Sequence, residues 1–175
     1  MTTPRRTGSL STLALALALA ASLLLVVSAC SGSGGSQVEA EGLILKDAWA
    51  RASAMSSGAG AAYVTVENTT ERVEKLLSAS VASSVARAAE IHETTTVSVG
   101  PSSTSIPSGA PEMMSMREVS SIQIPAGATL RMEPGGYHIM LLDLAEPLVA
   151  GQEFTLNLGF MNAGVVSIPV KVRAS

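Results

Sequence analysis

The chain holds only two histidines, His92 and His138, and His138 stands beside a methionine. Met140 follows His138 two places on, in the stretch YHIMLLDL. Such a stretch is typical of a β-strand, in which residues two apart share a face. His138 and Met140 would then project together, so an imidazole nitrogen and a thioether sulfur could bind one atom. The turn EPGG just before them predicts a place near a loop end of the sheet.

A second group of methionines lies between the two histidines, in MMSMREV. Met114 and Met116 share a face by the same alternation, whereas Met113 would face the other way. Nitrogen and thioether ligands without carboxylate or thiolate favour a soft metal of low charge, and Cu(I) fits best. These residue types therefore indicate a Cu(I) site.

Two other interpretations stand beside the metal site. Methionine commonly fills gaps in protein cores, and we expect this role for Met55, Met132 and Met161. A lone histidine is more often a surface or hydrogen-bonded residue than a ligand. Residue types and spacing alone leave these alternatives open.

The first 29 residues have the character of an export signal. Arg5 and Arg6 precede a long apolar run, which ends in VSAC at Cys30. We predict a lipoprotein signal peptide over residues 1–29, lipidation of Cys30, and anchoring to the outer face of the cell membrane. A transmembrane anchor is the alternative for residues 11–29, since a span needs about 20 apolar residues. Both interpretations place the folded part outside the cytoplasm.

The rest of the chain is predicted to form a tether and one domain. Residues 30–42 are rich in glycine and serine and predict a flexible tether, which leaves residues 43–175 as the domain. Loss of Arg5 and Arg6 lowers the net charge from −3 to about −5. No block of lysine or arginine suggests nucleic-acid binding. Because Cys30 carries the anchor, the domain has no disulfide and no thiolate ligand.

From residue 43 onward, short alternating stretches are separated by turn signals. This pattern predicts an all-β antiparallel sandwich or barrel, with strands over residues 43–52, 61–70, 73–81, 86–97, 115–119, 121–125, 129–134, 137–144, 153–160 and 165–172. Residues 83–90 offer a turn of helix as an alternative. Residues 97–112 are rich in proline, glycine and serine, so we expect a flexible loop there between two strands.

From about Asp47 to Arg173 the chain resembles the PCu(A)C copper chaperones. The resemblance is carried by AWARAS, GAGAAYVTVENTT, ASVASSVARAAEIHETT, MSMREV, IQIPAGATLRMEPGGYHIMLLDL and PLVAGQEFTLNLGFMNAGVVSIPVKV. The family motif ends in a methionine, twenty-one residues, and His-x-Met; Met116 and His138 are separated by the twenty-one residues 117–137. The first family ligand is a histidine in a HET context, which HETT at His92 matches.

The resemblance implies a cupredoxin-like Greek-key sandwich or barrel. It also implies Cu(I) ligands, which are His92, Met116, His138 and Met140. The family has about ten residues between its first histidine and its methionine, whereas twenty-three separate His92 from Met116 here; a longer surface loop adds little entropy cost. Met114 is a possible substitute for Met116, because a slip of two residues preserves the face.

The resemblance further implies a copper chaperone rather than an enzyme. Its partners would be the Cu(A) subunit of cytochrome c oxidase, a thioredoxin-like protein of the Sco type, or both. Contact with the membrane would be made through the lipid anchor only. Two alternatives remain at this point: a lipoprotein that stores or buffers copper in the cell envelope, and a metal-free β-sandwich that serves as an interaction module.

Overall fold

The structure is a computed structural model that describes residues 36–53, 58–97 and 113–174. The chain divides into two units, residues 1–33 and 34–175, and all described residues lie in the second. The predicted signal peptide and Cys30 lie outside the described residues, as do residues 98–112 of the expected loop. Nowhere in the described ranges is there a helix of the length and apolarity that crossing a membrane requires.

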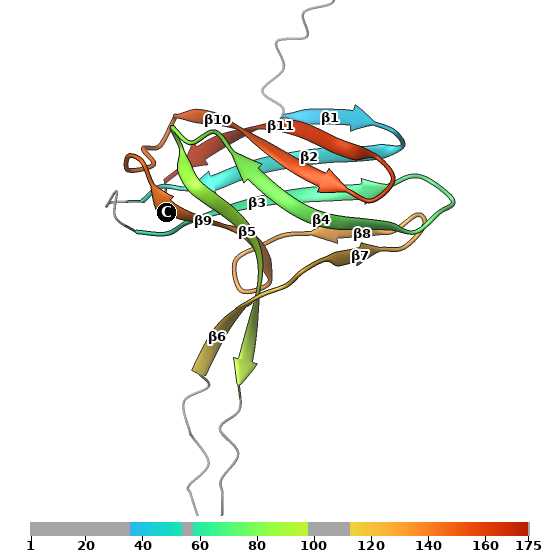
Figure 1. The fold of residues 1–175 in the computed structure, drawn as a ribbon, viewed down its shortest axis with the longest axis horizontal. Coiled ribbons are helices and arrows are strands. Elements are labelled where there is room, and N and C mark those ends of the chain that lie inside the picture. Colours follow the sequence, from blue (N-terminus) through green and yellow to red (C-terminus); the bar gives the residue numbers. More distant parts are fainter. Residues whose placement is uncertain (1–35, 54–57, 98–112, 175) are drawn as a thin grey trace, which may run out of the picture. The chain divides into compact units, whose positions relative to one another are not determined.

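Every regular element of the described residues is a β-strand, so the all-β prediction is confirmed (Figure 1). The strands are β1 Gln37–Ala40, β2 Leu43–Arg51, β3 Gly60–Asn68, β4 Glu74–Val81, β5 Ala86–Val97, β6 Met113–Glu118, β7 Ile122–Ile124, β8 Thr129–Arg131, β9 Tyr137–Leu144, β10 Glu153–Phe160 and β11 Gly164–Arg173.

Seven of these strands close into a barrel. They follow the order β2-β11-β10-β4-β5-β9-β3, and the pairing of β3 with β2 completes the ring. All neighbours in the ring are antiparallel except β11 and β2. The remaining strands add to its edges: β1 to β2, β6 to β5, β7 to β4 and β8 to β3. The far half of β5 and its partner β6 extend away from the other strands as a two-stranded arm (Figure 1).

Several boundaries differ from the sequence prediction: β6 begins at Met113 rather than 115, and β8 ends at Arg131 rather than 134. Two segments differ in kind. Residues 37–40, expected in the tether, form β1 and pair with residues 43–46 of β2. Val38 and Ala40 pack against the core, and this burial draws the segment into the fold. The helical alternative for residues 83–90 is wrong: a turn ends at Val85 and β5 begins at Ala86.

The core lies inside the barrel and is built by alternation along each strand. Strand β11 shows the pattern most clearly, with every second residue buried from Val166 to Val172. Met132 is buried at 4% exposure, as expected of a core methionine. Met161 is not: it is about half exposed, because it stands in the turn between β10 and β11. Met55 lies outside the described residues.

A β-bulge in β2 changes which residues of the strand face inward. Lys46 pairs with Thr65 and Trp49 pairs with Tyr63, so two residues of β2 stand opposite one residue of β3. Asp47, the first of the two, has a φ of 55°. Before the bulge the odd-numbered Leu43 and Leu45 are buried, and after it the even-numbered Ala48 and Ala50. The bulge thus turns Trp49 and Arg51 to the outside of the barrel.

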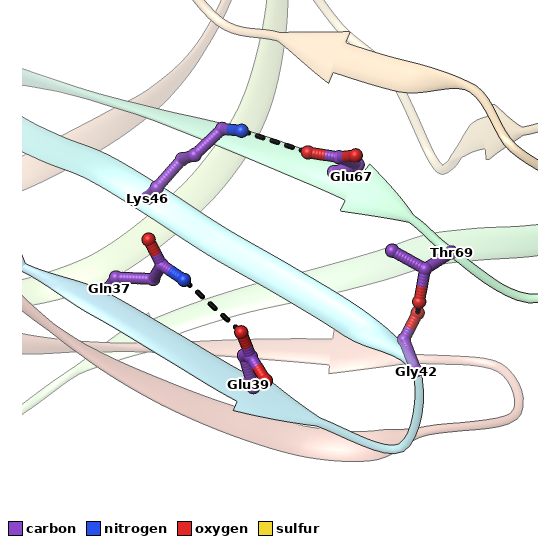
Figure 2. A network of polar contacts seen from close by, with 6 residues as sticks. All are labelled: Gln37, Glu39, Gly42, Lys46, Glu67 and Thr69. Atoms are coloured by element: carbon purple, nitrogen blue, oxygen red, sulfur yellow. Dashed lines mark hydrogen bonds and ion pairs between the residues drawn. The ribbon is translucent and has the colours of Figure 1, made fainter.

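At the start of β2, polar contacts fasten the β1–β2 turn and β2 itself to the end of β3 (Figure 2). The hydroxyl of Thr69 donates to the carbonyl of Gly42 over 2.8 Å, and Gly42 takes the positive φ of 78° that the tight turn needs. Lys46 pairs with Glu67 at 2.8 Å on the surface of neighbouring strands. Such an exposed pair is worth at most about 1 kcal/mol, so packing supplies most of the stability here.

A buried carboxylate fastens the β10–β11 turn to β4. Glu74 is only 4% exposed and accepts hydrogen bonds from the backbone N–H groups of Lys75, Asn162 and Ala163 at 2.8–3.2 Å. Burial raises the pKa of Glu74, but these hydrogen bonds outweigh it and hold the pKa below its ordinary value. The carboxylate therefore belongs to the folding framework.

Candidate metal site

The two histidines lie directly opposite each other on neighbouring antiparallel strands. His92 of β5 is the register partner of His138 of β9, and their ring centroids are 5.8 Å apart. His138 is only 4% exposed and the side chain of His92 14%. Directly opposed residues share a face and bring their Cβ atoms within about 5 Å. The barrel thus brings together two side chains that are 46 positions apart in the sequence.

Hydrogen bonds set which nitrogen of each ring keeps a free lone pair. Nδ1 of His138 lies 3.1 Å from the carbonyl oxygen of Gly136, which can only accept, so Nδ1 carries the proton and Nε2 is free. Nε2 of His92 lies 3.1 Å from a carboxylate oxygen of Glu90 and donates to it. Nδ1 of His92 is then the free nitrogen, and it is buried without a partner among the described residues. A buried acceptor without a partner is costly, and a bound metal would satisfy it.

Met140 extends this face along β9. It stands two residues from His138 and pairs with Glu90 on one side and Ala61 on the other. By strand alternation its thioether projects on the same side as the two imidazoles. Met140 is partly buried, and Glu90 on the neighbouring strand also supports His92.

The methionines of β6 reach the same face from the other side of β5. Met116 pairs with Thr94 and Met114 with Thr96, while His92 pairs with Glu118. Both methionines are exposed, Met116 at 58% and Met114 at 75%. A cleft of about 190 Å³ joins them to the barrel; its lining residues are Arg51, Tyr63, Thr94, Met114, Met116, Pro134, Gly135 and His138. His138 and both methionines of β6 therefore open onto one hollow.

A row of rings that the sequence did not predict continues from the histidines across the barrel. The rings of Tyr63 and His138 have centroids 6.4 Å apart, and those of Trp49 and Tyr63 4.5 Å apart. Beyond them, the guanidinium of Arg173 lies 5.4 Å from the centre of the Trp49 ring. The alternation of AAYVTVENTT places Tyr63 on one face of its strand, but Trp49 joins this row only through the bulge at Asp47. The row fixes the His138 ring from one side.

The cleft is lined by the nitrogen and sulfur donors of His138, Met114 and Met116 and by no carboxylate, and His92 and Met140 lie outside its lining. Two carboxylates share the face beyond it: Glu90 lies opposite Met140 and Glu118 opposite His92. Among the described residues, no group of three or more histidine, cysteine, aspartate or glutamate side chains is placed to hold a metal ion. A metal at this face would therefore draw on the thioethers of Met116, Met140 or Met114 beside the imidazoles. Soft ligands of this kind suit Cu(I) far better than zinc.

Comparison with known proteins gives the family. Residues 43–172 match the family described as "Putative lipoprotein LpqE-like". The chain is 36% identical over 135 residues to "Putative lipoprotein Lxx21020" of Leifsonia xyli subsp. xyli. The aligned region covers 76% of this chain and 72% of that protein.

Solved structures with a similar fold are PCuAC domains. The copper-bound PCuAC domain from PmoF2 has a TM-score of 0.60 at 22% identity and covers 79% of this chain and 98% of its own. The Cu(I) form of DR1885 from Deinococcus radiodurans has a TM-score of 0.53 at 23% identity and covers 82% and 83%. At this identity the likeness establishes the fold. The chain belongs to the LpqE-like family and has the cupredoxin-like all-β fold of the PCuAC domains.

Proposed function

We propose that this protein is an exported Cu(I)-binding chaperone whose ligands are His92, Met116, His138 and Met140. The observation that carries the proposal is the cross-strand pair His92 and His138, each with one ring nitrogen that has no hydrogen-bond partner among the described residues, beside thioethers on the same face. Copper forms of PCuAC domains that share the fold support it.

The spacing of the two imidazoles suits one shared ion. A metal bound about 2 Å from a ring nitrogen lies about 3 Å from the ring centroid. Two rings with centroids 5.8 Å apart can therefore share an ion after small rotations, without separation of β5 from β9. Because these ligands are neutral, the bound ion keeps its single charge, which favours Cu(I) over divalent ions.

The exposure of the sulfur ligands favours a carrier over a permanent metal site. Met116 is more than half exposed on the arm of β5 and β6, whereas His138 is buried. An incoming ligand can replace the thioether first while the imidazoles still hold the ion. Stepwise replacement of ligands lets copper pass to an acceptor without release into solution.

The acceptor we propose is the Cu(A) subunit of cytochrome c oxidase, reached directly or with a Sco-type thioredoxin-like protein. A lipid on Cys30 would keep the carrier at the outer face of the membrane. The LpqE-like lipoprotein family, to which the chain belongs, is consistent with this placement.

Titration of Cu(I) against bathocuproine disulfonate tests copper binding. We expect one Cu(I) per chain, and a double variant His138→Ala, Met140→Ala that no longer competes with the chelator. Met161→Ala is the matched control, since this methionine is half exposed in the β10–β11 turn. Full affinity in the double variant would refute the ligand assignment.

Gene deletion under copper limitation tests delivery. A carrier to the oxidase predicts that the deletion strain loses oxidase activity in scarce copper and recovers it when copper is added. Normal oxidase activity in scarce copper, with greater sensitivity to excess copper, would instead identify a copper buffer.

A further inference from the structure

Three cations gather on the outside of the barrel beside the candidate copper site. Arg51 of β2 is the register partner of Arg173 of β11, and Lys171 is the partner of Trp49. All three cations are exposed. Neighbouring strands lie about 4.8 Å apart, so these side chains form one patch, which we call the cationic edge.

No ion pair neutralises the cationic edge within the described part of the chain, although Glu153 of β10 is the register partner of Lys171. Lys46, Arg87 and Arg117 each pair with a carboxylate at 2.6–2.8 Å. Arg51, Lys171 and Arg173 make no ion pair with any described residue. Like charges opposite each other in a sheet are destabilising, and the protein as a whole is acidic, with a net charge of −3. Two opposed arginines without an ion pair, Arg51 and Arg173, favour an anion supplied from outside.

The cationic edge opens directly onto the cleft. Arg51 lines the same cleft as Met116 and His138. Its charge also reaches the Tyr63 phenol: burial raises the pKa of Tyr63, and the Arg51 guanidinium partly opposes that rise. Arg173 is held over Trp49, at the far end of the ring row from His138. One side of the cleft is thus positive, although the proposed copper ligands are neutral.

We propose that the cationic edge is the docking surface for the copper acceptor, which presents carboxylates to it. This inference rests on the proposed copper-carrier function. Acidic groups of the acceptor would meet Arg51, Lys171 and Arg173 while its metal ligands enter the cleft beside Met116. Opposite charges on two partners raise the rate of encounter and fix the orientation of docking, and salt weakens both effects.

Transfer of Cu(I) from the full chain to two chelators of different charge tests the proposal. Bathocuproine disulfonate is an anion and neocuproine is uncharged, and both bind Cu(I) with a change in absorbance that stopped-flow follows. We expect Arg51→Gln to slow transfer to the anionic chelator about three-fold and the triple variant Arg51→Gln, Lys171→Gln, Arg173→Gln about ten-fold or more. Transfer to neocuproine should stay within about two-fold, and added salt should remove the difference.

Two controls separate charge from structure. Arg51→Lys keeps the charge and should restore the wild-type rate. Arg72→Gln removes one charge in the turn that follows β3. Arg72 does not line the cleft, so this variant should leave the rate unchanged. If the triple variant unfolds, Arg51→Gln and Arg51→Lys still decide the question.

The failures of the two proposals can be told apart. A chain that does not bind Cu(I) at equilibrium refutes the copper-carrier function itself. A chain that binds Cu(I) but passes it to both chelators at rates independent of Arg51 overturns the docking surface alone. Unchanged transfer, together with loss of sedimentation on phosphatidylglycerol vesicles in the triple variant, would also overturn it and assign the cationic edge to lipid.

Discussion

His92 and His138 lie opposite each other on β5 and β9, and each has one ring nitrogen without a partner among the described residues: Nδ1 of His92, which is buried, and Nε2 of His138. The two rings supply one lone pair each to the same face of the barrel, and neither lone pair is used within the described residues.

This relationship predicts that the histidines bind copper as a unit. His92→Ala and His138→Ala should each weaken Cu(I) affinity at least about 100-fold, since even loss of a supporting residue costs about 10- to 100-fold. The double variant should lose less binding free energy than the two single variants together, because each single variant already prevents the two imidazoles from sharing one ion. Chelator competition on all four proteins measures this. Additive losses would mean that the imidazoles bind independently.

Glu90 should support copper binding without binding the metal. Its carboxylate accepts a hydrogen bond from Nε2 of His92 and so favours the tautomer of the neutral ring in which Nδ1 holds the lone pair. Glu90→Ala should weaken Cu(I) affinity about 10-fold, whereas Glu90→Gln, whose amide oxygen still accepts, should stay close to wild type. Nitrogen chemical shifts of His92 report the tautomer directly. Equal affinity in both variants and the wild type would remove Glu90 from the site.

Met116 should contribute more to copper binding than Met114. Strands rise about 3.3 Å per residue, so Met114, opposite Thr96, is about 7 Å farther along the arm from His92 than Met116, opposite Thr94. Met116→Leu should remove one sulfur neighbour from the X-ray absorption spectrum of the Cu(I) form, and Met114→Leu none. The reverse result would show that β6 binds copper with its register shifted by two residues.

Trp49 should report copper binding through its fluorescence. It is the only tryptophan, and the Tyr63 ring joins it to His138 with centroid separations of 4.5 and 6.4 Å. Rotation of His138 on binding should therefore alter the packing of Tyr63 against Trp49. We expect a saturable change in emission that is strongly reduced in Tyr63→Leu. A constant emission spectrum during a titration that chelator competition shows to be complete would contradict this coupling.

Glu74 should make the protein sensitive to acid. Because hydrogen bonds hold its folded pKa below the unfolded value, its contribution is fully present above the unfolded pKa of about 4.3 and is lost as the pH falls through the folded pKa. Glu74→Gln should lower the free energy of unfolding by about 1–3 kcal/mol at pH 7 and flatten its fall below about pH 4.3. Urea unfolding across this range measures both effects. If the free energy of unfolding fell with pH in the same way in both proteins, Glu74 would not be the source of the acid sensitivity.

Local pattern was enough to predict most strands. Strands β5, β9 and β10 begin and end where the alternation and the flanking turns of the sequence place them. The shared face of His138 and Met140 follows from the same period. Strand β1 was missed because glycine and serine dominate the residues just before it, and only its pairing with β2 reveals it.

The rest of the site depends on the pairing of strands that are far apart in the sequence. No local signal places His92 opposite His138, since that register is set by the way β5 and β9 close the barrel. Arg51 and Trp49 escaped prediction because the face they occupy is decided at Asp47, an ordinary aspartate with a left-handed backbone. Its positive φ is uncommon for such a residue.

The extra residue at Asp47 divides β2 into two zones with opposite rules for substitution. Odd-numbered positions before it must stay apolar, while odd-numbered positions after it are open to polar and charged side chains. Loss of one residue at this point would send Trp49 and Arg51 toward the interior and expose the two small alanines beside them. Relatives of different length here should therefore carry a different surface beside the histidines, even where the histidines themselves are retained.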